Sequence, residues 1–111
     1  MAKSTSQLYT ELLVLRSQRG EATAFEELVS LWTPRLHGYV RRMCEHDADA
    51  NDVVQETWCA VVQGLRKLEF VEAFPTWLFR ISTAKWTDHL RRHSRLREGP
   101  EEAVREVPEE D

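Results

Sequence analysis

Apolar residues recur every three or four positions along most of this chain. That spacing gathers them on one side of a helix, whereas a half-buried strand would alternate apolar and polar residues. Glycine and proline are scarce, with four of each, and runs of β-branched residues are short. The pattern therefore predicts an all-α protein, folded as a compact bundle of about four helices.

The first two helices are predicted at residues 5–17 and 22–44. Arg19-Gly20 follows the first, and a glycine just beyond the last helical residue is a common end signal. Pro34 lies inside the second and is expected to kink or break it, because its ring clashes with the preceding turn. Helical spacing in the first range is shown by Leu8, Leu12 and Leu15.

The other two helices are predicted at residues 48–68 and 75–95. Asp47 or Asp49 can accept the free amide hydrogens at the start of the third, where acids also suit the helix dipole. Pro75 is tolerated in the first turn of the fourth. The apolar seam of the third comprises Val54, Trp58, Val61, Leu65 and Leu68. The expected inner stripe of the fourth comprises Trp77, Leu78, Ile81 and Ala84.

The chain has 111 residues, which suits one small domain. We place that domain at residues 1–97 and treat residues 98–111, with their two prolines and seven acids, as a flexible acidic tail or linker. No apolar run approaches the roughly 18 residues that a membrane span needs, and no secretory signal is visible, so we expect no membrane insertion. The two cysteines lack a metal or redox spacing, which indicates reduced thiols and a cytoplasmic protein.

Known catalytic patterns are missing from the sequence. We find no glycine-rich phosphate loop, no nucleophile elbow and no constellation of catalytic carboxylates. We therefore expect a protein that is not an enzyme and that uses no cofactor.

The charge distribution matters more than the net charge of −4. The acidic tail accounts for the negative sign, and the remaining residues are slightly basic. Between Arg80 and Arg97 there are six basic residues and a single acid, Asp88. A phosphate responds to charge within a Debye length of about 8–10 Å, so a local basic patch is the feature to weigh.

The third predicted helix has a polar face opposite its apolar seam. A solvated surface explains such a face in most proteins. A docking face is the alternative, because Asp52, Gln55 and Glu56 could hold fixed hydrogen bonds to a partner helix.

The segment after the third helix combines large apolar side chains with basic ones. Most of the aromatic residues are expected in the core of so small a domain. A short apolar loop flanked by Arg66, Lys67 and a basic helix could also hold an unstacked base, an interaction worth about 1–3 kcal/mol. Arginines at the end of the fourth helix could simply complement its dipole, but their number favours phosphate binding.

His89 and His93 are four residues apart and could ligate a metal from one helix. Sequence offers no obvious third ligand, and neither Cys44 nor His46 lies at a zinc-site spacing. We therefore predict no metal site.

Three blocks in order resemble a known family. Asp49-Ala-Asn-Asp-Val-Val-Gln-Glu-Thr-Trp58 is similar to the DAEDLVQE block in region 2 of bacterial RNA polymerase sigma factors. Residues 20–29 resemble the opening GDxxAFxxL of the extracytoplasmic-function (ECF) group of the sigma-70 family. Residues 74–82 with 88–92 resemble the FxxWLYRIA…DxLRR of that group. The resemblance covers about residues 5–97.

The resemblance implies a transcription initiation module that docks on the coiled coil of the polymerase β′ subunit and recognises and melts the minus-ten promoter element. A base of the non-template strand would enter a pocket beside the loop at residues 68–74. An anti-sigma factor is a possible further partner. The implied polymerase-binding residues are Asp52, Gln55, Glu56, Cys59 and Gln63. The implied DNA-binding residues are Arg66, Lys67, Phe70, Phe74, Arg80, Thr83, Lys85, Thr87, Arg91, Arg92 and Arg95.

The chain departs from the family pattern in two respects that bear on function. Thr83-Ala84 stands where many relatives have Arg-Asn, and that asparagine is associated with the base pocket. Family members normally continue into a second domain that reads the minus-thirty-five element, whereas this chain ends in its acidic tail. We expect a fragment of a longer sigma factor. The alternatives are a protein-interaction module or decoy that binds polymerase or an anti-sigma factor without reading DNA, and a helical DNA-binding protein unrelated to polymerase.

Overall fold

A computed structural model of the chain describes residues 2–98, with side chains as far as Ser94. It contains four α-helices and two short 3₁₀ turns, and the described residues form no strand, which confirms the predicted all-α class. The helices are α1 (Thr5–Gln18), α2 (Ala22–Met43), α3 (Asp47–Gly64) and α4 (Phe74–Glu98). The 3₁₀ turns, η1 (Leu65–Lys67) and η2 (Val71–Ala73), lie between α3 and α4. The acidic tail predicted at residues 98–111 falls almost wholly outside the described residues.

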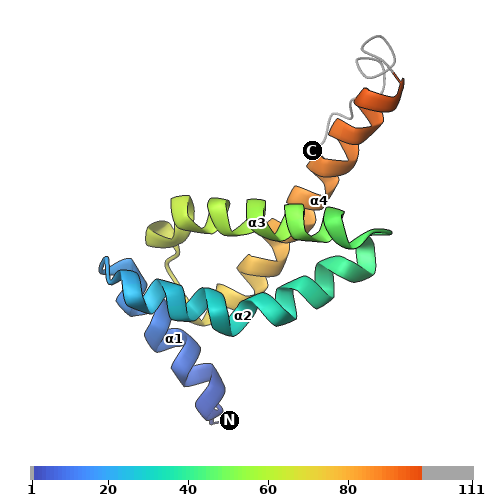
Figure 1. Cartoon of the computed structure of the whole chain (residues 1–111). Helices are drawn as coiled ribbons and strands as arrows, with labels where there is room; N and C mark the ends of the chain where they lie inside the picture. Colours follow the sequence, from blue (N-terminus) through green and yellow to red (C-terminus); the bar gives the residue numbers. More distant parts are fainter. Residues whose placement is uncertain (1, 99–111) are drawn as a thin grey trace.

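The helices pack mainly around α2, which contacts each of the other three. Helix α1 packs on α2, α3 packs on α4, and α2 contacts both α3 and α4. Figure 1 shows α4 passing the middle of the other helices, after which its C-terminal half projects beyond α3. That half of α4 is therefore accessible for contact with other molecules. Among the described residues, every helix is too short or too polar to span a bilayer.

The core is formed by one apolar side of each helix. Leu13, Leu28, Val53 and Leu78 are fully buried, one from each of the four helices. The polar atoms of the core tryptophans are satisfied, since the Trp32 indole donates to Thr10 Oγ1 at 3.1 Å and the Trp58 indole to Thr33 Oγ1 at 3.1 Å. The predicted apolar seam is confirmed for Val54, Trp58, Val61 and Leu65, which are buried, whereas Leu68 at its end is only partly buried.

Helix ends depart from the predictions in detail. α1 ends at Gln18 and is followed by Gly20 with φ 91°, the left-handed conformation that favours glycine, as predicted. α3 stops at Gly64, where η1 takes over. Neither Asp47 nor Asp49 caps α3, because His46 occupies the N-cap without a side-chain bond and both acids lie in the first turn.

Pro34 was expected to kink or break α2; the helix continues through it to Met43 and bends near its middle in Figure 1, in agreement with a kink. One further expectation needs correction. Ala84 is exposed, so it is not part of the inner stripe of α4. That stripe instead runs through Phe74, Leu78 and Ser82, which recur every four residues and are fully buried.

The side of α1 that faces the core also differs from its leucine spacing. Leu8, Leu12 and Leu15 are 53%, 48% and 44% exposed, whereas Leu13 and Val14 are fully buried. The spacing of the three leucines therefore predicted the helix correctly, but it did not predict which face of the helix is buried.

Candidate functional site

The polar face of α3 is a continuous surface opposite the buried seam. The five predicted docking residues recur along it at helical spacing, and four of them, Asp52, Gln55, Cys59 and Gln63, are exposed. Val62, 60% exposed, adds an apolar side chain to this face that the sequence analysis did not select. We call this surface the α3 face. Its composition, amides and acids around a small apolar group, suits contact with another protein.

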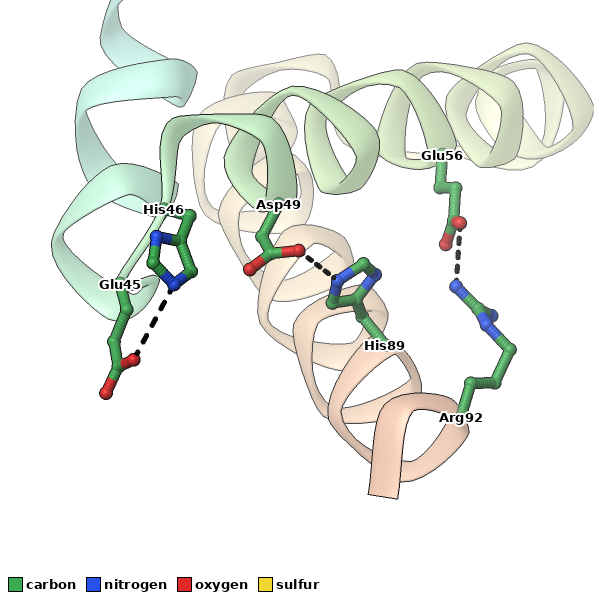
Figure 2. A network of polar contacts seen from close by, with 6 residues as sticks. All are labelled: Glu45, His46, Asp49, Glu56, His89 and Arg92. Atoms are coloured by element: carbon green, nitrogen blue, oxygen red, sulfur yellow. Dashed lines mark hydrogen bonds and ion pairs between the residues drawn. The ribbon is translucent and has the colours of Figure 1, made fainter. Parts of the chain in front are cut away.

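Glu56 and Arg92 connect the α3 face to α4. Arg92 donates to Glu56 Oε2 at 2.8 Å, and both side chains are partly exposed. Figure 2 shows the arginine reaching from α4 across to α3. A predicted DNA-binding residue is thus paired with a predicted docking residue, which the sequence did not reveal because 36 positions separate them.

A second link between the same helices joins Asp49 to His89. His89 Nε2 lies 3.0 Å from Asp49 Oδ1, and the histidine is almost completely buried (Figure 2). The hydrogen bond from His89 lowers the pKa of the Asp49 carboxyl below its ordinary value. Sequence analysis assigned the acid to a cap, so it missed this contact.

The predicted DNA-binding residues of α4 divide between two sides of the helix. Arg80, Thr83 and Thr87 are exposed and succeed one another three or four positions apart, which places them on one side. Arg92 faces α3, and Lys85, seven positions before it, lies on the same side as Arg92. The basic end of the helix is therefore not one continuous surface. Arg95 was also predicted here, but its side chain lies outside the described residues.

The hydroxyls on the exposed side of α4 bond within the protein. Thr83 Oγ1 donates to the Phe79 carbonyl at 3.1 Å and lies 2.9 Å from the Tyr39 hydroxyl. Thr87 Oγ1 donates to the Thr83 carbonyl at 3.1 Å. Thr83, at the position where the family pattern differs, is thus fixed against α2.

A groove lies beside this side of α4. It has a volume of about 630 Å³ and is lined by Arg35, Gly38, Tyr39, Arg42, Thr76 and Phe79. Its aromatic wall is a pair of rings, Tyr39 and Phe79, with centroids 4.9 Å apart. Arg35 and Arg42 are exposed at its rim. We call this the α2/α4 groove.

Arg35 and Arg42 of the groove, and the exposed Arg80 that follows Phe79, form no ion pair among the described side chains, although the Arg35 guanidinium lies over the Trp32 ring at 4.9 Å. Sequence analysis missed Arg35 and Arg42, although they lie at i and i+7 of one helix. Their spacing was a usable signal, but only the fold shows that α4 lies beside them.

The loop before α4 presents one aromatic ring to solvent. Phe70 is 64% exposed. Gln18 fixes the loop from the side of α1, because its amide donates to the carbonyls of Leu65 and Leu68, each at 2.9 Å. Arg66 and Lys67, also predicted to bind DNA, are exposed beside it.

Phe74 does not belong to this surface. It is fully buried, and its ring centroid lies 6.1 Å from those of Trp32 and Trp77. Its predicted DNA contact was therefore wrong, because the ring that starts α4 points into the core. Arg91 is half-buried beside Asp88, at an NH1–Oδ1 distance of 3.4 Å.

The two cysteines are free thiols, Cys44 buried and Cys59 exposed on the α3 face. Burial raises the pKa of the Cys44 thiol, which suits a packed side chain rather than a reactive one.

Comparisons with known proteins identify the fold and the relatives. The family described as Sigma-70 region 2 matches residues 28–96. RNA polymerase sigma-H factor of Pseudomonas aeruginosa is 35% identical over 78 residues, covering 70% of this chain and 40% of that protein. ECF RNA polymerase sigma-E factor of Haemophilus influenzae is 33% identical over 89 residues, covering 80% of this chain and 47% of that protein. The chain thus spans less than half the length of these relatives.

A solved structure has the same architecture. It is described as an NMR structure of the complex formed by an engineered region 2 of sigmaE with GTAAAA, and it matches with a TM-score of 0.75 at 28% identity. The match covers 89% of this chain and all of the other.

Proposed function

We propose, because this chain belongs to the sigma-70 family as a region 2 domain of the ECF group, that it is a transcription initiation factor domain that docks on RNA polymerase and recognises the minus-ten promoter element. The observation that carries the proposal is the pairing of two surfaces on one small body. The α3 face suits a protein partner, and the α2/α4 groove with Phe70 suits single-stranded nucleic acid. Such a domain works in the cytoplasm, where polymerase and promoter meet.

The α3 face would contact the coiled coil of the β′ subunit. Asp52, Gln55, Cys59 and Gln63 are exposed and free to meet partner side chains, and Glu56 can exchange its bond to Arg92 for one to the partner. Charged pairs of this kind fix register and orientation more than they add raw affinity. Docking would thereby set where the rest of the domain meets DNA.

The groove would hold the non-template strand. Arg35 and Arg42 in the groove and the exposed Arg80 on α4 offer positive charge for phosphates. Tyr39 and Phe79 in the groove and the exposed Phe70 offer rings for bases. Arg66 and Lys67 add charge beside the loop. Because a flipped base is bound only when it is unpaired, binding shifts the duplex toward its open form. The mechanism is binding, and no bond is made or broken.

The proposed docking on polymerase is tested by reversing the charge of an acidic residue of the α3 face that forms no ion pair with the described side chains. Asp52→Lys should reduce the amount of core polymerase retained in a pull-down, with unchanged helical circular dichroism. Glu27→Lys, at an exposed acid of α2, is the matched control and should bind as the unaltered chain does. Equal retention by both variants would contradict docking through the α3 face.

A second candidate function is a module that binds polymerase or an anti-sigma factor without reading DNA. The observation in its favour is Thr83-Ala84: the Thr83 hydroxyl is held by Tyr39 and Phe79, and the exposed Ala84 stands where the family pattern has its base-pocket asparagine. Single-stranded minus-ten oligonucleotides separate the two functions. Binding no tighter than that of a scrambled oligonucleotide, with docking intact, would favour the second.

A further inference from the structure

Three side chains of types that bind metals converge between the start of α3 and the second half of α4. The ligand atoms of Asp49, His89 and His93 all lie within 4.8 Å of one another. Asp49 comes from the first turn of α3, and the two histidines lie one turn apart on α4. Figure 2 shows Asp49 and His89 facing one another across the two helices. The fold therefore supplies the third ligand that sequence alone did not offer.

The two histidine rings lie against one another, with their planes tilted by 33°. Their centroids are 4.1 Å apart. Histidines at i and i+4 lie on one side of a helix, so both rings can reach the same point. His93 is exposed, which leaves its ring free to adjust by the ångström or so needed to close the cluster around an ion.

A hydrogen bond between Asp49 and His89 is the simplest account of this cluster. It explains the 3.0 Å distance between their atoms but leaves two features open. His89 Nδ1 is buried with no hydrogen-bond partner among the described side chains, and the exposed His93 ring lies against the ring of His89. An ion shared by Asp49 and His89 would lie at Nε2, the nitrogen beside Asp49, so it would give His93 a role but would not supply a partner for Nδ1.

The donor set selects the ion. Two imidazole nitrogens and one carboxylate oxygen suit zinc, which takes three such ligands and a water in tetrahedral sites. Magnesium and calcium prefer oxygen ligands throughout and fit this set poorly. The charge is also suitable, because one carboxylate and two neutral imidazoles leave the divalent ion partly uncompensated, as in sites with an open fourth position.

We propose that Asp49, His89 and His93 bind one zinc ion, which ties the start of α3 to the second half of α4. The ion would fix the α3 face relative to the basic part of α4 that projects beyond the bundle. Zinc binds only where the three groups are brought together, so it stabilises the folded chain over the unfolded one. The inference does not depend on the proposed function, since it concerns ligands that neither proposed surface uses.

The test is a zinc titration of the whole chain after chelator treatment, with zinc alone as the probe. We expect one zinc per chain and a higher midpoint of thermal unfolding when zinc is added. His93→Ala removes an exposed ligand without opening the core, and we expect it to weaken binding about tenfold or more. Asp49→Asn should weaken binding in the same direction. Cobalt(II) should give the visible absorption of a four-coordinate site, and both variants should abolish it.

His46→Ala is the matched control, because His46 is an exposed histidine three residues from Asp49 that is not part of the cluster. We expect this variant to bind zinc as the unaltered chain does. Zinc affinity unchanged in His93→Ala, or reduced equally in His46→Ala, would overturn the proposal. Circular dichroism of each variant separates loss of the site from loss of the fold. Magnesium should neither bind nor raise the midpoint.

Discussion

The α3 face and the α2/α4 groove are built in different ways. The α3 face comes from one helix, and its residues stand within one short stretch of sequence. The groove joins α2 to α4, and the residues of its two walls, such as Tyr39 and Phe79, are far apart in the chain. A surface of the first kind depends on helix formation alone, whereas one of the second kind depends on how helices pack. The groove is therefore the more sensitive to changes in the core.

Phe74→Ala should give the largest loss of stability, because it removes a core side chain from the helix packing on which the groove depends. The ring is fully buried against Trp32 and Trp77. Removing a buried phenylalanine costs about 3–5 kcal/mol, a large share of the stability of a small domain. The free energy of unfolding from urea titration measures it. A decrease below about 1 kcal/mol would mean that the ring is not a core residue.

Phe70→Ala is the matched substitution on the surface. The ring is 64% exposed, so its removal should change the free energy of unfolding by about 0.5 kcal/mol or less. If Phe70 stacks on a base, affinity for a single-stranded minus-ten oligonucleotide should fall by about 1–3 kcal/mol. Fluorescence anisotropy with a labelled oligonucleotide measures that affinity. Unchanged affinity would remove Phe70 from the DNA surface and leave the loop a structural connection.

The pair of phenylalanines also shows where the sequence could and could not predict the site. Helical periodicity predicted the helices and the seam of α3, because a regular helix repeats its own geometry. It did not separate Phe70 from Phe74, since both are aromatic residues of one connecting segment. The turn η2 lies between the two rings. α4 follows it at Phe74, one residue before the predicted start at Pro75, and Phe74 is buried whereas Phe70 is exposed.

Contacts between distant residues were likewise hidden from the sequence. Asp49 matches an N-terminal acid of a helix in its local pattern, and only the position of α4 brings it to His89. The same is true of Arg35 and Arg42, which are ordinary exposed arginines of α2 until α4 closes a groove beside them. The exposed side chains of the α3 face could thus be predicted from one stretch of sequence. The groove and the cluster at Asp49 could not, because they form only when distant helices pack together.

Arg35→Ala together with Arg42→Ala tests whether the groove holds phosphates. For each phosphate that the variant no longer neutralises, the slope of log affinity against log salt should become shallower by about 0.7 for a single strand. The double variant should therefore bind oligonucleotides more weakly at low salt, with a flatter salt dependence. Affinity measured at several salt concentrations gives the slope.

Arg41→Ala is the control for the groove arginines. Arg41 adjoins Arg42 in sequence but is engaged by Asp47, at 3.5 Å, and by the Cys44 carbonyl, at 2.8 Å. Its replacement should leave the salt slope unchanged. A slope that falls as much in this variant as in the double variant would show a general effect of charge rather than phosphate binding in the groove.

The smallest effect is expected where α4 contacts the α3 face, at the pair of Glu56 and Arg92. Both side chains are partly exposed, and a solvent-exposed ion pair contributes about 0–1 kcal/mol. Arg92→Ala should therefore change the free energy of unfolding by that amount or less, while leaving Glu56 free for a partner. If Glu56 binds polymerase, this variant should be retained in a pull-down at least as well as the unaltered chain.

A double-mutant cycle of Arg92→Ala with Glu56→Gln isolates the interaction energy of the pair. A coupling energy well above about 1 kcal/mol would show that this ion pair holds the α3 face to α4, and that docking through Glu56 must break it.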